Sequence, residues 1–142
     1  MLSKACEYGI RATIYIARQS LKGHRSNLKE ISSAIQSPLA FTAKILQQLV
    51  RSSIITSVKG TKGGFEIDNK TIQTLPVSHI INAIDGDEIF NSCVLGLREC
   101  SEKNPCPLHK KYKVIRKEMT AMTEGTLLIN LVRGLKTTVL RN

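Results

Sequence analysis

Three cysteines and a histidine stand close together in the chain, between residues 93 and 109. Six residues separate Cys93 from Cys100, five separate Cys100 from Cys106, and two separate Cys106 from His109. Thiolates and neutral imidazoles are ordinary ligands of zinc and of iron–sulfur clusters. Reduced thiols in an exposed loop are also open to oxidation. These residue types therefore predict a metal site or a redox-active thiol site.

Packing alone is the alternative explanation, because a free cysteine behaves as a small hydrophobic residue. The residues between these cysteines are mostly polar, and Gly96, Pro105 and Pro107 favour a loop over a core segment. The cysteine gaps are longer than those of structural zinc pairs and of the bacterial ferredoxin pattern. Spacing therefore leaves zinc, an iron–sulfur cluster and thiol oxidation open.

The charge distribution indicates a polyanionic partner for the first half of the chain. The 142 residues carry a net charge of +10. Residues 1–70 hold 11 Lys and Arg against 4 Asp and Glu (+7), whereas residues 71–142 hold 10 against 7 (+3). With three Tyr, three Phe and no Trp, the chain is poor in the aromatic side chains that stack single-stranded bases, which favours a duplex. A solvated surface of high solubility explains the charge equally well.

The start of the chain lacks the apolar core of a secretory signal, because Glu7 and Arg11 interrupt it. No apolar run is long enough to span a bilayer. We therefore expect a cytoplasmic protein that binds no membrane and keeps its thiols reduced. Four cysteines then favour metal, cluster or redox chemistry over disulfides. An enzyme is not expected, since no Ser/His/Asp set appears and the acidic residues are scattered.

Apolar residues at helical spacing, separated by turn and cap residues, predict a mainly helical fold. Asn27 is expected to cap the second helix and Ser37 the third, with Pro38 as the first residue of the third. The predicted helices cover residues 2–21, 28–35, 38–51, 76–84, 108–124 and 127–132, and residues 69–76 are predicted to be a polar connector.

The second and third helices have the arrangement of a helix-turn-helix, although any helical hairpin in a bundle looks similar. The third helix would bury one apolar stripe and present polar side chains to groove edges and phosphates. The residues of this turn and helix that we expect to contact DNA are Ser37, Thr42, Lys44, Gln47 and Gln48.

A β-hairpin is predicted directly after the third helix, from the strand-like residues 54–58 and 65–67. The turn between them carries Lys59, Thr61 and Lys62. A hairpin with a basic tip after a recognition helix is the wing of a winged helix, and it can lie along phosphates or in the minor groove. A Walker-type phosphate loop and a KH-domain loop both fit poorly, because each requires a helix beside the glycines.

This order of elements resembles the IscR/NsrR family of bacterial winged-helix regulators, also called the Rrf-type family. The resemblance covers nearly the whole chain, and its most specific parts are VKGTKGGFEI at 58–67, INAIDG at 81–86 and the cysteine triad. It implies a homodimeric transcriptional repressor that binds a partly palindromic double-stranded DNA operator. It also implies a cluster that senses redox state, nitric oxide or iron–sulfur status.

The resemblance implies that Cys93, Cys100 and Cys106 hold this cluster, of the 2Fe–2S type in preference to 4Fe–4S, with zinc as the alternative metal. His109 has the spacing of the fourth ligand in the IscR-like branch. Glu7 is the alternative fourth ligand, because an acidic residue in the partner subunit's first helix completes the site in the NsrR-like branch. The chain departs from the family pattern in its six-residue first cysteine gap, in Ala43, where a base-reading acidic residue is common, and in Lys59, where arginine is common.

The predicted fold class is therefore mainly α with a small β-hairpin wing: a winged helix-turn-helix followed by a long C-terminal dimerisation helix. We expect residues 1–86 to form the DNA-binding domain and residues 87–109 the sensor loop. Residues 110–142 would form the dimerisation helix and a last helix that packs back on the winged helix. Two other functions stay open, namely a DNA-binding regulator with a cluster-free thiol switch, and a small zinc or iron–sulfur metalloprotein without a DNA function.

Overall fold

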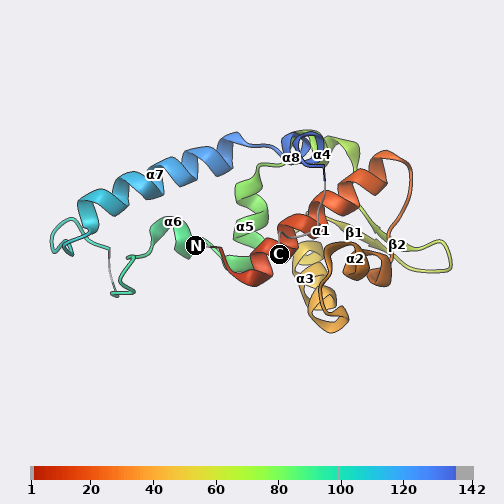
Figure 1. Ribbon diagram of the computed structural model, residues 1–142, viewed down its shortest axis with the longest axis horizontal. Coiled ribbons are helices and arrows are strands. Elements are labelled where there is room, and N and C mark those ends of the chain that lie inside the picture. The colour runs from red at the N-terminus through yellow and green to blue at the C-terminus, as the bar shows by residue number, and fades with distance from the viewer. Residues whose placement is uncertain (1, 99, 137–142) are drawn as a thin grey trace.

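The computed structural model describes residues 2–98 and 100–136, which form a mainly helical fold with a two-stranded antiparallel sheet (Figure 1). The predicted fold class is confirmed. The helices are α1 (Lys4–Leu21), α2 (Leu28–Ile35), α3 (Leu39–Arg51), α4 (Asn69–Thr74), α5 (Val77–Asp85), α6 (Glu88–Asn91), α7 (His109–Gly125) and α8 (Leu128–Gly134), and the strands are β1 (Thr56–Val58) and β2 (Gly64–Glu66). In this part of the chain no helix has the length and apolar character needed to cross a membrane.

Short polar side chains begin several of these helices by accepting hydrogen bonds from backbone N–H groups that would otherwise lack a partner. Asn27 accepts from the N–H of Glu30 at 2.9 Å, as predicted, and begins α2. Asp68 accepts from the N–H of Thr71 at 2.9 Å and begins α4. The predicted polar connector over residues 69–76 was therefore wrong, since it contains a helix. Pro38, rather than Ser37, occupies the cap position of α3.

Helix α1 lies at the centre of the main hydrophobic core and packs against α2, α3, α5, α8 and β2. Gly9 gives room for the close approach of α5, because a Cβ atom there would lie 1.9 Å from the end of the Ile84 side chain, which would have to shift. We refer to α1–α5, β1, β2 and α8 as the winged-helix unit. The side chains buried most completely in this unit include Ile14, Ile16, Ile31, Ile35, Ile45, Leu46, Leu49, Ile72, Ile80 and Leu128.

The wing is the β1–β2 hairpin, in which Ser57 lies opposite Phe65. The α1–α2 loop extends this sheet, because the N–H of Phe65 donates to the carbonyl of Ser26 at 2.8 Å and the N–H of Ser26 donates to the carbonyl of Phe65 at 3.1 Å. Gly64 permits the close approach of this loop. Its φ is +142°, and a Cβ atom there would lie 2.8 Å from the carbonyl oxygen of Ser26.

Helix α7 extends away from the winged-helix unit (Figure 1), and Cys93, Cys100 and Cys106 lie in the segment between α6 and α7. We refer to α6, the described residues between α6 and α7, and α7 itself as the sensor arm. As predicted, residues 93–98 and 100–108 contain no helix or strand. The chain then returns through α8, which packs against α1 and α4. The division into domains at residues 86/87 and 109/110 stays a prediction.

Candidate DNA-binding surface and cysteine site

The turn between α2 and α3 is held by hydrogen bonds among its own residues. Gln36 adopts a left-handed conformation with φ of 52°. The hydroxyl of Thr42 lies 2.8 Å from that of Ser37 and 2.9 Å from the carbonyl of Pro38. Thr42 is fully buried and Ser37 is 7% exposed. The structure therefore differs from the expectation that these two side chains face DNA, because both are inside the turn and fix the start of α3.

The outer face of α3 retains three of the polar side chains that were expected to contact DNA. Lys44 and Gln47 are exposed, and Gln48 is half-buried. The opposite face places Ile45, Leu46 and Leu49 in the core. Lys44 and Gln47 can therefore reach a groove without disturbing the packing that fixes the helix.

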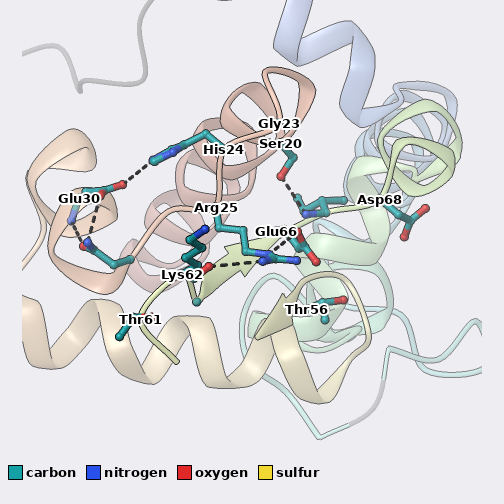
Figure 2. Close-up of a pocket in the computed structure, with 13 residues that line it drawn as sticks. Ser20, Gly23, His24, Arg25, Glu30, Thr56, Thr61, Lys62, Glu66 and Asp68 are labelled. Carbon is teal, nitrogen blue, oxygen red and sulfur yellow. Dashed lines mark hydrogen bonds and ion pairs between the residues drawn. The ribbon is translucent and has the colours of Figure 1, made fainter. Parts of the chain in front are cut away.

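The wing tip presents Lys59, Thr61 and Lys62, all of which are exposed. Its base is bound to the α1–α2 loop by Arg25, which donates to the carboxylate of Glu66 at 2.8 Å and to the carbonyl of Lys62 at 3.4 Å. Figure 2 shows Arg25 between the strand that carries Glu66 and the chain at Lys62. The basic tip is thus an exposed loop on a base that is fixed by backbone and side-chain contacts.

The predicted metal ligands come together as two pairs. The sulfur atoms of Cys93 and Cys106 are 3.9 Å apart. The sulfur of Cys100 lies 3.3 Å from Nδ1 of His109, the first residue of α7. Among the described residues, no three His, Cys, Asp or Glu side chains gather closely enough to hold one metal ion. The cysteine site therefore consists of a Cys–Cys pair and a Cys–His pair.

Both pairs contain a buried member with unusual polar surroundings. His109 is 7% exposed, and its Nε2 has no hydrogen-bond partner among the described residues. Cys93 is also 7% exposed. The pKa of its thiol is lowered, and the largest cause is the backbone N–H of Leu95. Leu97, Cys106 and Arg116 lower this pKa further, and together these groups outweigh the opposing effect of burial. Backbone N–H groups aimed at a sulfur favour the thiolate, which is the form that binds metals and reacts with oxidants.

The alternative ligand Glu7 and the fourth cysteine of the chain, Cys6, lie on α1, outside this site. Glu7 forms an ion pair with Lys4 at 3.0 Å on the surface of the helix. Cys6 is fully buried beside Val77 and Ile81. Burial, followed by the nearby charge of Asp85, raises the pKa of Cys6 to about 12. Cys6 is therefore a core residue, in contrast to the cysteines of the sensor arm.

Sequence reasoning missed two arginines that support the proposed sites. Arg25 fixes the base of the wing, and Arg116 contacts both the cysteine site and the end of α6. Each contact joins residues that are far apart in sequence, so helical or strand periodicity gave no signal. For Arg25, the sequence shows only that it and Glu66 carry opposite charges, and this does not specify that they form a pair.

Comparisons with known proteins agree with this architecture. The Rrf2 family, described as iron-dependent transcriptional regulators, matches residues 2–134. A protein of Aquifex aeolicus (strain VF5) named as an HTH-type transcriptional regulator is 26% identical over 134 residues, which are 93% of this chain and 91% of that protein. A second such protein, from Azotobacter vinelandii, is 25% identical over 125 residues, which are 88% of this chain and 74% of that protein.

Solved structures show the same fold. The global cysteine regulator CymR of B. subtilis gives a TM-score of 0.77 at 17% identity, covering 96% of this chain and 98% of that chain. IscR of T. potens gives a TM-score of 0.72 at 15% identity, covering 94% of this chain and 87% of that chain. Because the family match extends over nearly all of the chain, as the sequence motifs predicted, this chain belongs to the Rrf2 family of transcriptional regulators.

Proposed function

We propose that this transcriptional regulator represses by binding a partly palindromic duplex operator, and that an iron–sulfur cluster in the sensor arm modulates this binding. Membership of the Rrf2 family supports DNA binding and argues against a metalloprotein without a DNA function. The observation that supports the cluster is the arrangement of four donor residues as two pairs, Cys93 with Cys106 and Cys100 with His109. A regulator of this kind acts in the cytoplasm, where its operator is.

For DNA binding, we assign α3 to the major groove and the wing to the phosphate backbone or the minor groove. Lys44, Gln47 and Gln48 would read or flank base edges, because these side chains lie on the face of α3 that is not packed in the core. Lys59, Thr61 and Lys62 at the exposed wing tip would contact phosphates. Ser37 and Thr42 are left out of this assignment because their side chains are buried.

A duplex-binding titration at several salt concentrations tests this assignment. Replacing Lys59 or Lys62 by Ala is expected to weaken binding to all sequences and to reduce the slope of log K against log salt by about one unit each. The matched control is Lys117→Ala, which removes an exposed lysine from α7. Equal slopes in the wild type and the wing variants would contradict the wing assignment.

For the cluster, the donor residues fit a 2Fe–2S group, in which each of two irons takes two protein ligands. Two sulfur atoms bound to one tetrahedral metal at about 2.3 Å would lie about 3.8 Å apart, and Cys93 and Cys106 are separated by 3.9 Å. The buried Nε2 of His109 has no hydrogen-bond partner among the described residues, and a bond from this nitrogen to a metal would satisfy it. The bound group would supply one-electron redox chemistry. Glu7 is kept as the alternative fourth ligand, contributed by a second subunit.

Exposed apolar side chains on α7 support a homodimer. Ile115 is 56% exposed, Val114 is 58% exposed and Met122 is 62% exposed. Such a run on a long helix that projects from the winged-helix unit suits a helix–helix interface with a second copy (Figure 1). Two copies related by a twofold axis would place two α3 helices on a partly palindromic operator.

The experiment that tests the cluster is purification without oxygen, followed by an absorption spectrum and analysis of iron, sulfide and zinc. We expect a coloured protein with equal iron and sulfide, and loss of both in Cys106→Ala. Cys6→Ala is the matched control, because Cys6 is in the core of the winged-helix unit and not in the sensor arm. A colourless protein with stoichiometric zinc would replace the cluster by a zinc site, and a colourless, metal-free protein would favour the thiol switch.

A cluster-free thiol switch is the second candidate, because Cys93 and Cys106 are close enough to form a disulfide after a small movement. Hydrogen peroxide would accept two electrons and two protons from the thiols, giving one disulfide and two waters. One of the solved structures with this fold is an oxidized form of Staphylococcus aureus CymR, with a TM-score of 0.75 and 20% identity. Peptide mapping after peroxide treatment would detect the Cys93–Cys106 linkage. Unchanged operator affinity in the oxidised protein would contradict the switch.

A further inference from the structure

Arg116, on the side of α7 that faces the cysteines, joins three parts of the sensor arm through a single nitrogen. Its Nη1 donates to the carbonyls of Asn91 at 3.1 Å and Ser92 at 2.9 Å, and it lies 3.2 Å from the sulfur of Cys100. The guanidinium also lies over the ring of Tyr112, 5.6 Å from the ring centroid. A cation over an aromatic face is restricted in its orientation, so Tyr112 helps to hold the guanidinium in place.

These contacts lie on both sides of the first cysteine gap. Asn91 and Ser92 directly precede Cys93, and Cys100 is the next ligand candidate along the chain. One cation on α7 therefore fixes the start of the segment and its second cysteine to the same point of the helix. Other polar contacts also join this segment to α7, namely Cys100 with His109 and Glu102 with Lys113, and Arg116 adds the contacts to the residues directly before Cys93.

Apolar packing contributes little to the position of this segment. Val94, Leu95 and Leu97 are 46%, 53% and 54% exposed, respectively. The backbone contact from the N–H of Gly96 to the carbonyl of Cys93, at 3.0 Å, forms a turn within the segment and does not join it to α7. The attachment to α7 next to Cys93 therefore depends on the polar contacts of Arg116, whereas Cys100 is held by both Arg116 and His109.

We propose that Arg116 is a positioning residue, which holds Cys93 and Cys100 against α7 and stabilises negative charge on the sulfur of Cys100. Its meaning for regulation rests on the proposed function above, in which the state of these cysteines is transmitted to the dimer helix. A hydrogen-bonding cation at a ligand sulfur favours the reduced, more negative form of an iron–sulfur group and so raises its reduction potential. Because one nitrogen makes all three contacts, a lysine ammonium with three N–H donors can replace part of them.

The first test is hydrogen exchange in the metal-free protein, with Arg116→Gln, Arg116→Lys and Lys117→Gln. Lys117 is the matched control because it is the next residue on α7, carries the same charge and is exposed. Amides of residues 92–98 are expected to exchange at least about tenfold faster in Arg116→Gln, since hydrogen bonds to a charged group are lost. Arg116→Lys is expected to retain part of the protection and Lys117→Gln all of it. Equal exchange in Arg116→Gln and Lys117→Gln would overturn the proposal.

The second test is the reduction potential of protein reconstituted with iron and sulfide. The potential should become more negative in Arg116→Gln, less so in Arg116→Lys, and stay unchanged in Lys117→Gln. A purely structural role for Arg116 would not give this order, and an unchanged potential in Arg116→Gln would overturn the charge-stabilising role. If the wild type binds no iron while Arg116→Gln still accelerates exchange, the proposed cluster fails but the positioning role stands.

Discussion

The winged-helix unit and the sensor arm differ in how much of their side-chain surface is buried. The unit contains a continuous core of aliphatic side chains from six helices and the residues around the wing. In the described residues 88–98 and 100–125 of the arm, only Cys93, His109 and Thr123 are buried. The winged-helix unit therefore has a packed core of its own, whereas most of the sensor arm is exposed and is held in part by polar contacts and, by our proposal, by a second subunit and a bound cluster.

The largest expected difference between the two regions is in the alkylation rates of their cysteines. In metal-free protein at pH 8, Cys6 should be alkylated more than about a hundredfold more slowly than Cys106, because the reactive thiolate of Cys6 is suppressed and the side chain is buried. Cys6 is fully buried with a pKa of about 12, whereas Cys106 is partly exposed. Mass spectrometry of peptides from timed reactions with iodoacetamide measures both rates.

Alkylation in denaturant provides the control for this prediction. Unfolding exposes all thiols, so Cys6 and Cys106 should then react at similar rates. If Cys6 already reacts as fast as Cys106 in the folded protein, then the core around α1 opens as readily as the arm, and the contrast between the regions is lost.

Truncation of buried and exposed leucines tests the same contrast through stability. Leu46→Ala should lower the free energy of unfolding by about 2–5 kcal/mol, because this side chain of α3 is fully buried in the main core and its removal leaves a cavity. Leu97→Ala, at a position that is 54% exposed in the arm, should change it by no more than about 0.5 kcal/mol. Urea denaturation followed by circular dichroism measures both. A large loss of stability in Leu97→Ala would show that the arm has a packed core of its own.

Glycine substitutions distinguish the base of the wing from the end of α7. Gly64→Ala should destabilise the protein by about 1–3 kcal/mol and weaken operator binding, because alanine is strained at this backbone conformation and its Cβ would meet the carbonyl of Ser26. Gly125→Ala is the matched control. A Cβ atom there would meet nothing within 4 Å, so this change should be neutral or stabilising by up to about 1 kcal/mol. Thermal unfolding and operator titration measure the two effects, and equal stability of the two variants would contradict the close contact at Ser26.

Most of the fold could be predicted because its signals are local. The spacing of Ile10, Ile14 and Ala17 defines α1, and the cap at Asn27 defines the start of α2. The glycines and lysines of residues 59–64 define the wing. Helix α4 was missed because its six residues contain a single apolar side chain, Ile72, and so show no apolar periodicity, although Asp68 with Thr71 was a readable cap.

The candidate site was predictable in its residue types but not in its pairing. Four donors at given spacings allow several pairings, and only the folded loop brings Cys93 to Cys106 and Cys100 to His109. Thr42 was misplaced because its polar hydroxyl was assigned to the outer face of α3. A threonine hydroxyl can instead bond to the preceding turn, as Thr42 does with Pro38, and so be satisfied while buried.

Arg25 gives the smallest expected effect, and its comparison with Arg116 is the sharpest test of the difference between the two regions. The Arg25 and Glu66 side chains are 41% and 36% exposed, so a double-mutant cycle with Arg25→Gln and Glu66→Gln should give a coupling of about 0–1 kcal/mol that decreases in high salt. Two backbone hydrogen bonds between Ser26 and Phe65 still hold the wing after this pair is removed. Amide exchange at the wing should therefore change by less than about threefold in Arg25→Gln, whereas Arg116→Gln should release residues 92–98. A larger effect of Arg25→Gln than of Arg116→Gln would mean that the wing, and not the sensor arm, is the region that depends on a single side chain.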